Sequence, residues 1–238
     1  MPFAHTPIAL APLLCTDFVN FILRHHTSPT TLIICSSREA FLQGIQACIN
    51  YTHPRDPSTD SSNEPSFDAS HAALHPLLVP TIHLIAMSRS VNLAFTPTLP
   101  HLRAYLATCI SSIGSPSTAS TFTKPGSQYP MLAVWGFATL HRSTAEHSAQ
   151  GLSRSLGAAV ETAKLNGQRL VLAESTALSG EVEYEGVDSV GNPWKEQVPL
   201  LSGSVRFGGE DRMWAGKTVE VETVVRRWCR FVTVGDGG

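Results

Sequence analysis

The turn after the apolar run at residues 31–35 is the first place where this chain could bind a phosphate group. In α/β folds, phosphate binds between the first strand and its helix, because free backbone amides and the helix dipole meet there. A phosphate loop needs glycines for a tight cradle, a lysine for the β and γ phosphates, and a Ser or Thr for magnesium. This turn reads Ser36-Ser37-Arg38-Glu39, with neither glycine nor lysine. We interpret it as a plain strand-to-helix turn capped by Ser36 or Ser37.

Two other strand ends bear on nucleotide chemistry. The run at residues 131–135 should end in an acidic residue if the chain held magnesium or polarised water, but it ends in Trp135, before Gly136. Glu174 follows the run at residues 169–173, where α/β enzymes often keep a catalytic group. We favour a solvated strand-end carboxylate for Glu174. The sequence therefore predicts a protein that is not an enzyme and has neither catalytic residues nor a cofactor.

Three other patterns that carry chemistry elsewhere are incomplete here. The segment Gly151-Leu-Ser153-Arg-Ser155 lacks the second glycine of a nucleophile elbow and falls inside a helical pattern. None of the ten histidines stands in a metal-binding spacing, and we interpret His141 and His147 as surface or cap residues. The five cysteines are widely spaced and form no C-x-x-C pair. They are typical of reduced, buried thiols in the cytosol or nucleus.

The densest basic run lies near the end of the chain. It consists of Arg226, Arg227, Trp228 and Arg230, and it is a candidate contact with DNA or with a partner protein. Arginines bind phosphates and acidic surfaces, and an aromatic side chain stacks on a base. The alternative is an edge strand with Trp228 packed inward and the arginines in water.

Composition indicates one packed domain spanning residues 1–238. Hydrophobic residues make up 42% of the chain and charged residues 15%, which excludes a disordered protein. The formal net charge of −2 gives no strong positive field, so DNA contact would need a local patch. The N-terminus lacks the basic start of a signal peptide, and no apolar run has the roughly 20 residues of a membrane span. We expect a soluble intracellular protein.

Polar breaks divide the chain into strand and helix units. Segments near 53–70, 111–129 and 179–195 are rich in Pro, Ser, Gly or acidic residues and indicate loops or linkers, the third an exposed excursion. Strand-like runs at 31–35, 91–95 and 131–135 are each followed by a helical pattern, the last predicted to start at Ser143 with Glu146 as its capping-box partner. Residues 169–173 form a fourth strand, and the tail adds strand-like pieces at 198–205, 217–224 and 228–234.

This alternation predicts an α/β fold with a mostly parallel sheet, helices on both faces and antiparallel edge strands from the C-terminal tail. The layout resembles the RecA-like recombinase paralogues, especially the small members that partner a SWIM-domain protein in Shu-type complexes. Residues 31–50 stand where that family has its first strand, phosphate loop and helix, and residues 131–136 where it has its second nucleotide motif. No catalytic residue of the family carries over.

The resemblance implies a non-hydrolysing, RecA-like nuclear subunit that assembles with recombinase paralogues or a SWIM-domain protein and supports homologous recombination and DNA repair. DNA would be contacted through the complex. Two alternatives stay open: a RecA-like accessory subunit of Elongator, which acts on transfer RNA modification in the cytoplasm, and a small-molecule enzyme with a pocket at the carboxyl ends of the strands. Under the assembly hypothesis, the N-terminal stretch that includes Phe18 and Phe21 is the first candidate partner surface.

Overall fold

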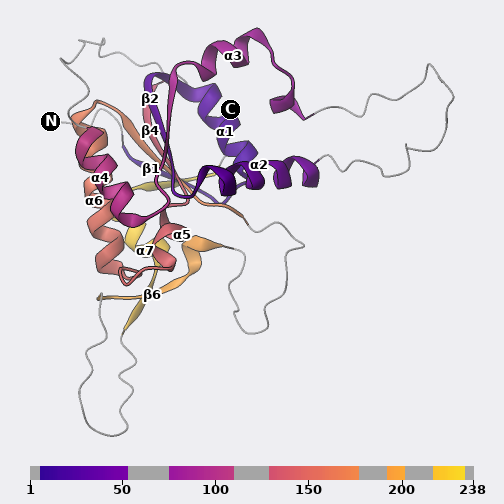
Figure 1. Ribbon diagram of the computed structural model, residues 1–238. Helices are drawn as coiled ribbons and strands as arrows, with labels where there is room; N and C mark the ends of the chain where they lie inside the picture. The colour runs from indigo at the N-terminus through magenta and orange to yellow at the C-terminus, as the bar shows by residue number, and fades with distance from the viewer. Residues whose placement is uncertain (1–5, 53–74, 110–128, 177–191, 202–216, 234–238) are drawn as a thin grey trace, which may run out of the picture.

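A six-stranded parallel sheet with helices on both faces forms the centre of the molecule (Figure 1). This computed structural model describes residues 6–52, 75–109, 129–176, 192–201 and 217–233. The strand order is β3-β2-β4-β5-β1-β8, and every neighbouring pair is parallel. The strands are β1 (Ile8–Leu10), β2 (His26–Ile34), β3 (Val91–Phe95), β4 (Tyr129–Trp135), β5 (Arg169–Ala173) and β8 (Arg230–Val232). The predicted α/β fold is confirmed.

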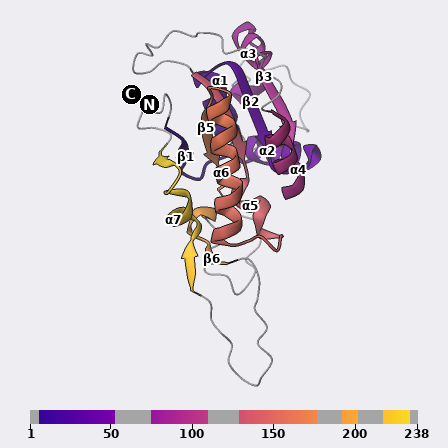
Figure 2. The same ribbon diagram turned by 90° about the vertical axis from the view of Figure 1, so that its left-hand side faces the viewer.

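The helices divide between the two faces of the sheet. One face is covered by α1 (Cys15–His25) and α2 (Arg38–Thr52). The other is covered by α4 (Leu99–Cys109), α5 (Phe137–Arg142), α6 (Ala149–Leu165) and α7 (Val221–Val225), as Figure 2 shows from the side of α6. The short helices η2 (Pro76–Leu78) and α3 (Ile82–Ser88) precede β3, and η3 (Pro193–Lys195) precedes β6 (Gln197–Pro199). Strand β6 pairs antiparallel with β7 (Thr218–Glu220) in a separate two-stranded sheet.

Side-chain alternation in the strands explains why both faces must be covered. In β4, Leu132 and Val134 pack against α4, α5 and α6, whereas Met131 and Trp135 face α1 and α2. All four side chains are buried, because alternate residues of a strand point to opposite faces of the sheet. A continuous apolar run is therefore what a central parallel strand requires.

The strand-like runs of the first three quarters of the chain are confirmed, but one strand was missed. The three-residue strand β1 lies between β5 and β8, and not at an edge. Its short apolar segment is flanked by Pro7 and Pro12 and gives little local signal. The first strand of the fold is therefore β1, and the turn that follows it is residues 11–14.

The longest helix starts later than the sequence predicted. Helix α6 begins at Ala149, and its N-cap is Ser148, whose hydroxyl accepts a hydrogen bond from the amide of Gly151 at 3.0 Å. Ser143 instead ends the separate helix α5. The predicted capping box is wrong because the carboxylate of Glu146 binds Arg103, a residue of another helix.

The tail differs in part from its prediction. The predicted antiparallel pairing is found in β6 and β7, while β8 joins the main sheet parallel to β1. Residues 221–225 form the helix α7 and not a strand. Trp194, predicted to lie in an exposed excursion, is 1% exposed, and its indole Nε1 donates a hydrogen bond to the carbonyl of Leu10 at 2.9 Å. The predicted loop at 53–70, and most of those at 111–129 and 179–195, lie outside the described residues, and Tyr129 is the first residue of β4.

Candidate functional site

The carboxyl ends of the parallel strands form the edge where open α/β sheets bind ligands. Strand β1 leads into α1 on one face, whereas β4 and β2, which are neighbours, lead to opposite faces through α5 and α2. Such a reversal of connections opens a crevice beyond the strand ends. Any nucleotide or small-molecule site of this fold is therefore expected at this edge.

The turns after β1 and β2 cannot cradle phosphate in the manner of a phosphate loop. The turn after β1, residues 11–14, reads Ala-Pro-Leu-Leu, and the turn after β2 contains Ser36 and Ser37. Glycine and lysine are absent from both turns. The hydroxyl of Ser37 accepts a hydrogen bond from the amide of Ala40 at 3.1 Å, so it caps α2, as the sequence predicted.

An aromatic pair occupies the end of β4, where a nucleotide-hydrolysing domain has a magnesium-binding carboxylate. The ring of Trp135 stacks on Phe18 of α1, with ring centroids 5.1 Å apart. Trp135 is 8% exposed and Phe18 is fully buried. The end of β4 therefore contributes apolar packing between the sheet and α1.

A cavity of about 500 Å³ opens beside this aromatic pair; we call it the carboxyl-edge cavity. It lies between α2 and the ends of β2, β4 and β5. None of its lining residues carries a formal charge, and they are Cys15, Ser36, Ala40, Phe41, Gln43, Gly44, Ala47, Cys48, Trp135, Ser175 and Thr176. Among the described residues, no cationic side chain lines the cavity to neutralise a polyphosphate.

Glu174, at the end of β5, is completely buried, so the predicted solvated carboxylate is wrong. Its carboxylate accepts hydrogen bonds from the amide of Ala138 at 2.5 Å and from the hydroxyl of Thr139 at 2.8 Å. It therefore caps the start of α5. Burial raises the pKa of Glu174 from its ordinary 4.5 to about 7, although these donors act in the opposite direction.

Two cysteines lie in contact at the wall of the carboxyl-edge cavity. The thiol of Cys15, the first residue of α1, donates to Sγ of Cys48 in α2, with the two sulfurs 3.3 Å apart. Each residue is only 4% exposed. Burial and the neighbouring Cys48 raise the pKa of Cys15 to about 12, so Cys15 is a neutral thiol at physiological pH.

His141 and Ser155 form a close Ser–His pair, but both side chains are fully buried. The Nδ1 atom of His141 lies 2.9 Å from the carbonyl of Phe137, so Nδ1 carries the proton and donates. Nε2 then accepts from the hydroxyl of Ser155 at 3.0 Å. Burial lowers the pKa of His141, which keeps the ring neutral. The predicted surface or cap position of His141 is wrong.

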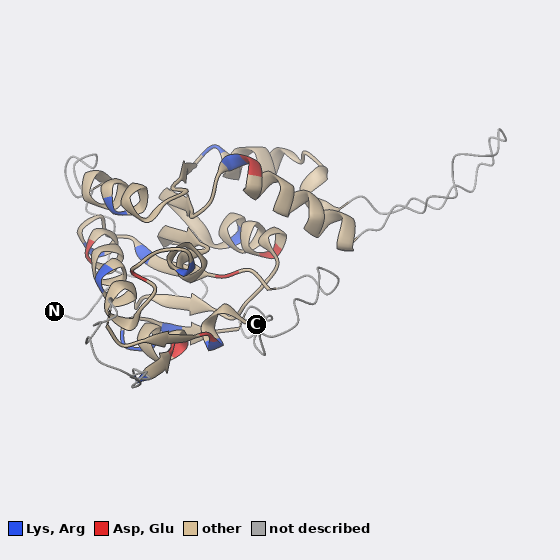
Figure 3. Ribbon diagram, turned by 60° about the horizontal axis from the view of Figure 1, so that its bottom comes forward, with Lys and Arg blue, Asp and Glu red and all other residues tan. Residues whose placement is uncertain are grey.

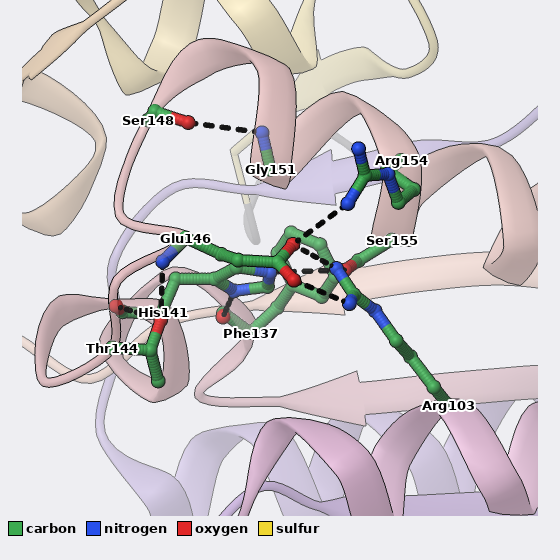
Figure 4. A network of polar contacts seen from close by, with 9 residues as sticks. All are labelled: Arg103, Phe137, His141, Thr144, Glu146, Ser148, Gly151, Arg154 and Ser155. Atoms are coloured by element: carbon green, nitrogen blue, oxygen red, sulfur yellow. Dashed lines mark hydrogen bonds and ion pairs between the residues drawn. The ribbon is translucent and has the colours of Figure 1, made fainter. Parts of the chain in front are cut away.

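The same network continues to an ion pair between helices (Figure 4). Arg103 of α4 makes a bidentate pair with Glu146, and it also donates to the hydroxyl of Ser155 at 3.2 Å. Every polar atom of the Ser155 side chain thus has a partner, and the serine has no access to solvent. The network ties α4, α5 and α6 together and has the properties of a structural element, not of a hydrolase site.

All three arginines of the tail's basic run are exposed, and one of them, Arg226, is also paired. Arg226 forms an ion pair with Glu222 and lies over the ring of Phe231, with 4.8 Å from its Cζ atom to the ring centroid. Arg227 and Arg230 are exposed. Trp228 is 37% exposed and rests against α6 near Gly157. Figure 3 shows lysines and arginines of the described residues on several different elements.

The two phenylalanines predicted as a partner surface have different environments. Phe18 belongs to the core between α1 and the sheet, so its prediction as a surface residue is wrong. Phe21 is half-buried, stacks on His25 with ring centroids 4.5 Å apart, and lines a second cavity of about 400 Å³ beside α1. Helical spacing alone does not tell which of two residues three apart faces the sheet.

The described residues define a parallel α/β protein whose turns after β1 and β2 contain neither glycine nor lysine. Residues 8–235 match the family described as SPAC22G7.03-like, and because this match covers most of the chain, the protein belongs to that family. No curated protein matches the sequence. Within the described ranges, no helix is both long and apolar enough to cross a bilayer.

Proposed function

We propose that this protein is a non-hydrolysing, RecA-like subunit of a nuclear complex that supports homologous recombination and DNA repair. Its partners are other RecA-like paralogues or a SWIM-domain protein. The parallel sheet is compatible with a RecA-like core. The glycine-free turns after β1 and β2, together with Trp135 at the end of β4, support a role without nucleotide hydrolysis.

One observation carries the assembly part of the proposal: large apolar side chains are exposed on consecutive elements before and within β3. We call this set the β3–α3 surface, and it comprises Leu78, Val79, Ile82, Ile85 and Leu93. Ile82 is 88% exposed and Leu93 is 52% exposed. No residue of α3 is buried. An apolar surface of this kind is typical of a protein contact.

The backbone at the same place favours a protein partner. Strand β3 forms one edge of the six-stranded sheet, so only one side of its backbone pairs with a described strand, β2. Between residues 76 and 95 the only Lys, Arg, Asp or Glu is Arg89. Natural edge strands usually carry charges that prevent pairing with other chains. A partner strand or helix that covers β3 and α3 would bury these apolar groups.

DNA would be contacted mainly through the assembled complex. The net charge is −2, and Arg226 is already paired with Glu222. Arg227 and Arg230 remain exposed and could add a local contact with phosphate or with an acidic partner surface. Binding to DNA by the isolated chain should therefore be weak and should fall steeply with salt.

A matched pair of variants tests this proposal in cells that lack the endogenous gene. Ile82→Asp places a charge on the β3–α3 surface at a side chain that supports little of the fold. The control, Leu165→Asp, places a charge outside that surface, at the end of α6, where the Leu165 side chain is 58% exposed. We expect gene loss and Ile82→Asp to lower the frequency of homologous recombination equally, while Leu165→Asp restores it.

Normal recombination frequency after gene loss would overturn the proposed function. If transfer RNA modification were lost instead, the Elongator alternative would replace it. Equal defects in both variants, with unchanged thermal unfolding, would mean that the β3–α3 surface is not the contact.

A second candidate function rests on the carboxyl-edge cavity. A cavity of about 500 Å³ with hydroxyl, amide and thiol groups suits an uncharged small molecule better than a nucleotide. Thermal-shift screening of the purified protein against neutral metabolites tests this enzyme or ligand-binding alternative. A stabilising compound whose effect is lost in Gln43→Ala would support it.

A further inference from the structure

We propose that Cys15 and Cys48 form a redox modification site, in which hydrogen peroxide converts the two thiols into a disulfide that links α1 to α2. The inference rests on the contact between the two sulfurs and on their place in the wall of the carboxyl-edge cavity. It does not depend on the role in recombination.

The geometry places the two sulfurs close to bonding distance. They are 3.3 Å apart, and a disulfide bond is about 2.05 Å long, so a movement of roughly 1.3 Å would join them. The helices α1 and α2 lie side by side over one face of the sheet (Figure 1). Residues 15 and 48 are far apart in sequence, so the contact exists only in the folded chain.

The cavity gives a small oxidant a route to the pair. Both cysteines line it, together with the small or polar side chains of Ser36, Ala47 and Ser175. Hydrogen peroxide is about the size of two water molecules, and a cavity of about 500 Å³ admits it. The other cysteines lack this combination: Cys35 and Cys229 are buried without a described thiol neighbour, and Cys109 contacts the side chain of Asn166.

The hydrogen bond assigns an order to the two thiols. Cys15 donates to Sγ of Cys48, so the thiol hydrogen of Cys15 is engaged in the contact and that of Cys48 is not. Cys48 therefore reacts first. The raised pKa of Cys15 keeps its thiol protonated until the second step.

The reaction balances without a further reagent. The Cys48 thiolate attacks one peroxide oxygen, the O–O bond breaks, and the hydroxide that leaves takes up a proton to become water. The Cys48 sulfenic acid is then attacked by the sulfur of Cys15, the S–O bond breaks, and the thiol proton of Cys15 leaves with the hydroxide as a second water. Each sulfur gives up one electron, and both peroxide oxygens are reduced.

The full-length reduced protein is treated with graded hydrogen peroxide, then denatured, alkylated with N-ethylmaleimide and digested for mass spectrometry. We expect a linked peptide pair containing Cys15 and Cys48, which a dithiol reductant separates. Cys35, Cys109 and Cys229 should stay fully alkylated. The urea-unfolded protein serves as the control for reactivity without the native contact, and it should show no preference for this pair.

Variants separate the two steps. In Cys15→Ser, dimedone should trap a sulfenic acid at Cys48, while in Cys48→Ser neither a linked peptide nor a sulfenic acid at Cys15 should form. Circular dichroism establishes that each variant is folded, and Cys48→Ala replaces Cys48→Ser if the serine unfolds the chain. The oxidised wild type should also unfold at a higher temperature than the reduced protein, because the new bond restrains the unfolded chain.

Three results would overturn the proposal. One is full alkylation of Cys15 and Cys48 in the folded protein at peroxide levels that oxidise the unfolded control. The second is equal oxidation of all five cysteines. The third is a disulfide that forms only between two molecules.

Discussion

The buried carboxyl group of Glu174 should make the stability of this protein depend on pH. Its pKa in the folded protein is about 7, against an ordinary value of 4.5. Between these two values the folded state binds more protons than the unfolded state, so the free energy of unfolding falls as pH rises. The stabilisation is fully present below pH 4.5 and is lost as pH passes through about 7.

The size of the effect follows from the two pKa values. One pKa unit corresponds to about 1.4 kcal/mol, so the free energy of unfolding should fall by roughly 2–3 kcal/mol between pH 5 and pH 8 from this group alone. In Glu174→Gln, the group no longer ionises and this contribution disappears. Gln can still accept the hydrogen bond from the amide of Ala138, which keeps α5 capped.

Urea unfolding followed by circular dichroism, at several pH values from 5 to 8, measures the difference. The wild type and Glu174→Gln are compared with Glu161→Gln, a change of an exposed carboxyl group in α6. We expect the Glu161→Gln curve to run parallel to the wild type and the Glu174→Gln curve to be flatter by roughly 2–3 kcal/mol over this range. Parallel curves for all three proteins would refute the reasoning, because they would mean that Glu174 stays ionised in the core.

Two further pairs of variants test the packing. Phe18→Ala should lower the free energy of unfolding by about 3–5 kcal/mol and Tm by roughly 10 °C, because the ring is fully buried against Trp135. Phe21→Ala should lower the free energy of unfolding by about 1 kcal/mol or less, because Phe21 is only half-buried. Similar thermal melts for the two variants would contradict the assignment of Phe18 to the core. A Cβ atom at position 151 would lie 2.2 Å from the carbonyl oxygen of Glu146, so Gly151→Ala should cost about 1–3 kcal/mol. Gly44→Ala meets no atom within 4 Å and should gain up to about 1 kcal/mol, and calorimetry that ranks these two in the opposite order would refute the local geometry.

Much of the sheet could be predicted because central parallel strands are buried on both faces. The apolar runs at β2, β4 and β5 need no information about their neighbours to be recognised. Strand β1 could not be found in this way, because a three-residue strand in a short segment between prolines is fixed only by pairing with β5 and β8, which are far away in sequence. The same holds for Trp194, which is buried because its indole reaches the end of β1.

Local sequence patterns also gave a wrong prediction where a side chain binds a residue of another element. The residues Ser143 and Glu146 have the spacing of a capping box, but the carboxylate of Glu146 forms an ion pair with Arg103. Helix α6 is capped by Ser148 instead. The contact between Cys15 and Cys48 had no signal in the sequence, since neither spacing nor flanking residues mark it. Both features depend on how helices pack, which a single sequence does not specify.

Purification of the tagged protein from its native cells at mild salt, with identification of the co-purifying chains by mass spectrometry, tests the central claim most directly. The proposed assembly predicts a RecA-like recombinase paralogue or a SWIM-domain protein in stoichiometric amount with the wild type and with Leu165→Asp, and its loss with Ile82→Asp. Recovery of the wild-type chain without any stoichiometric partner would contradict the claim.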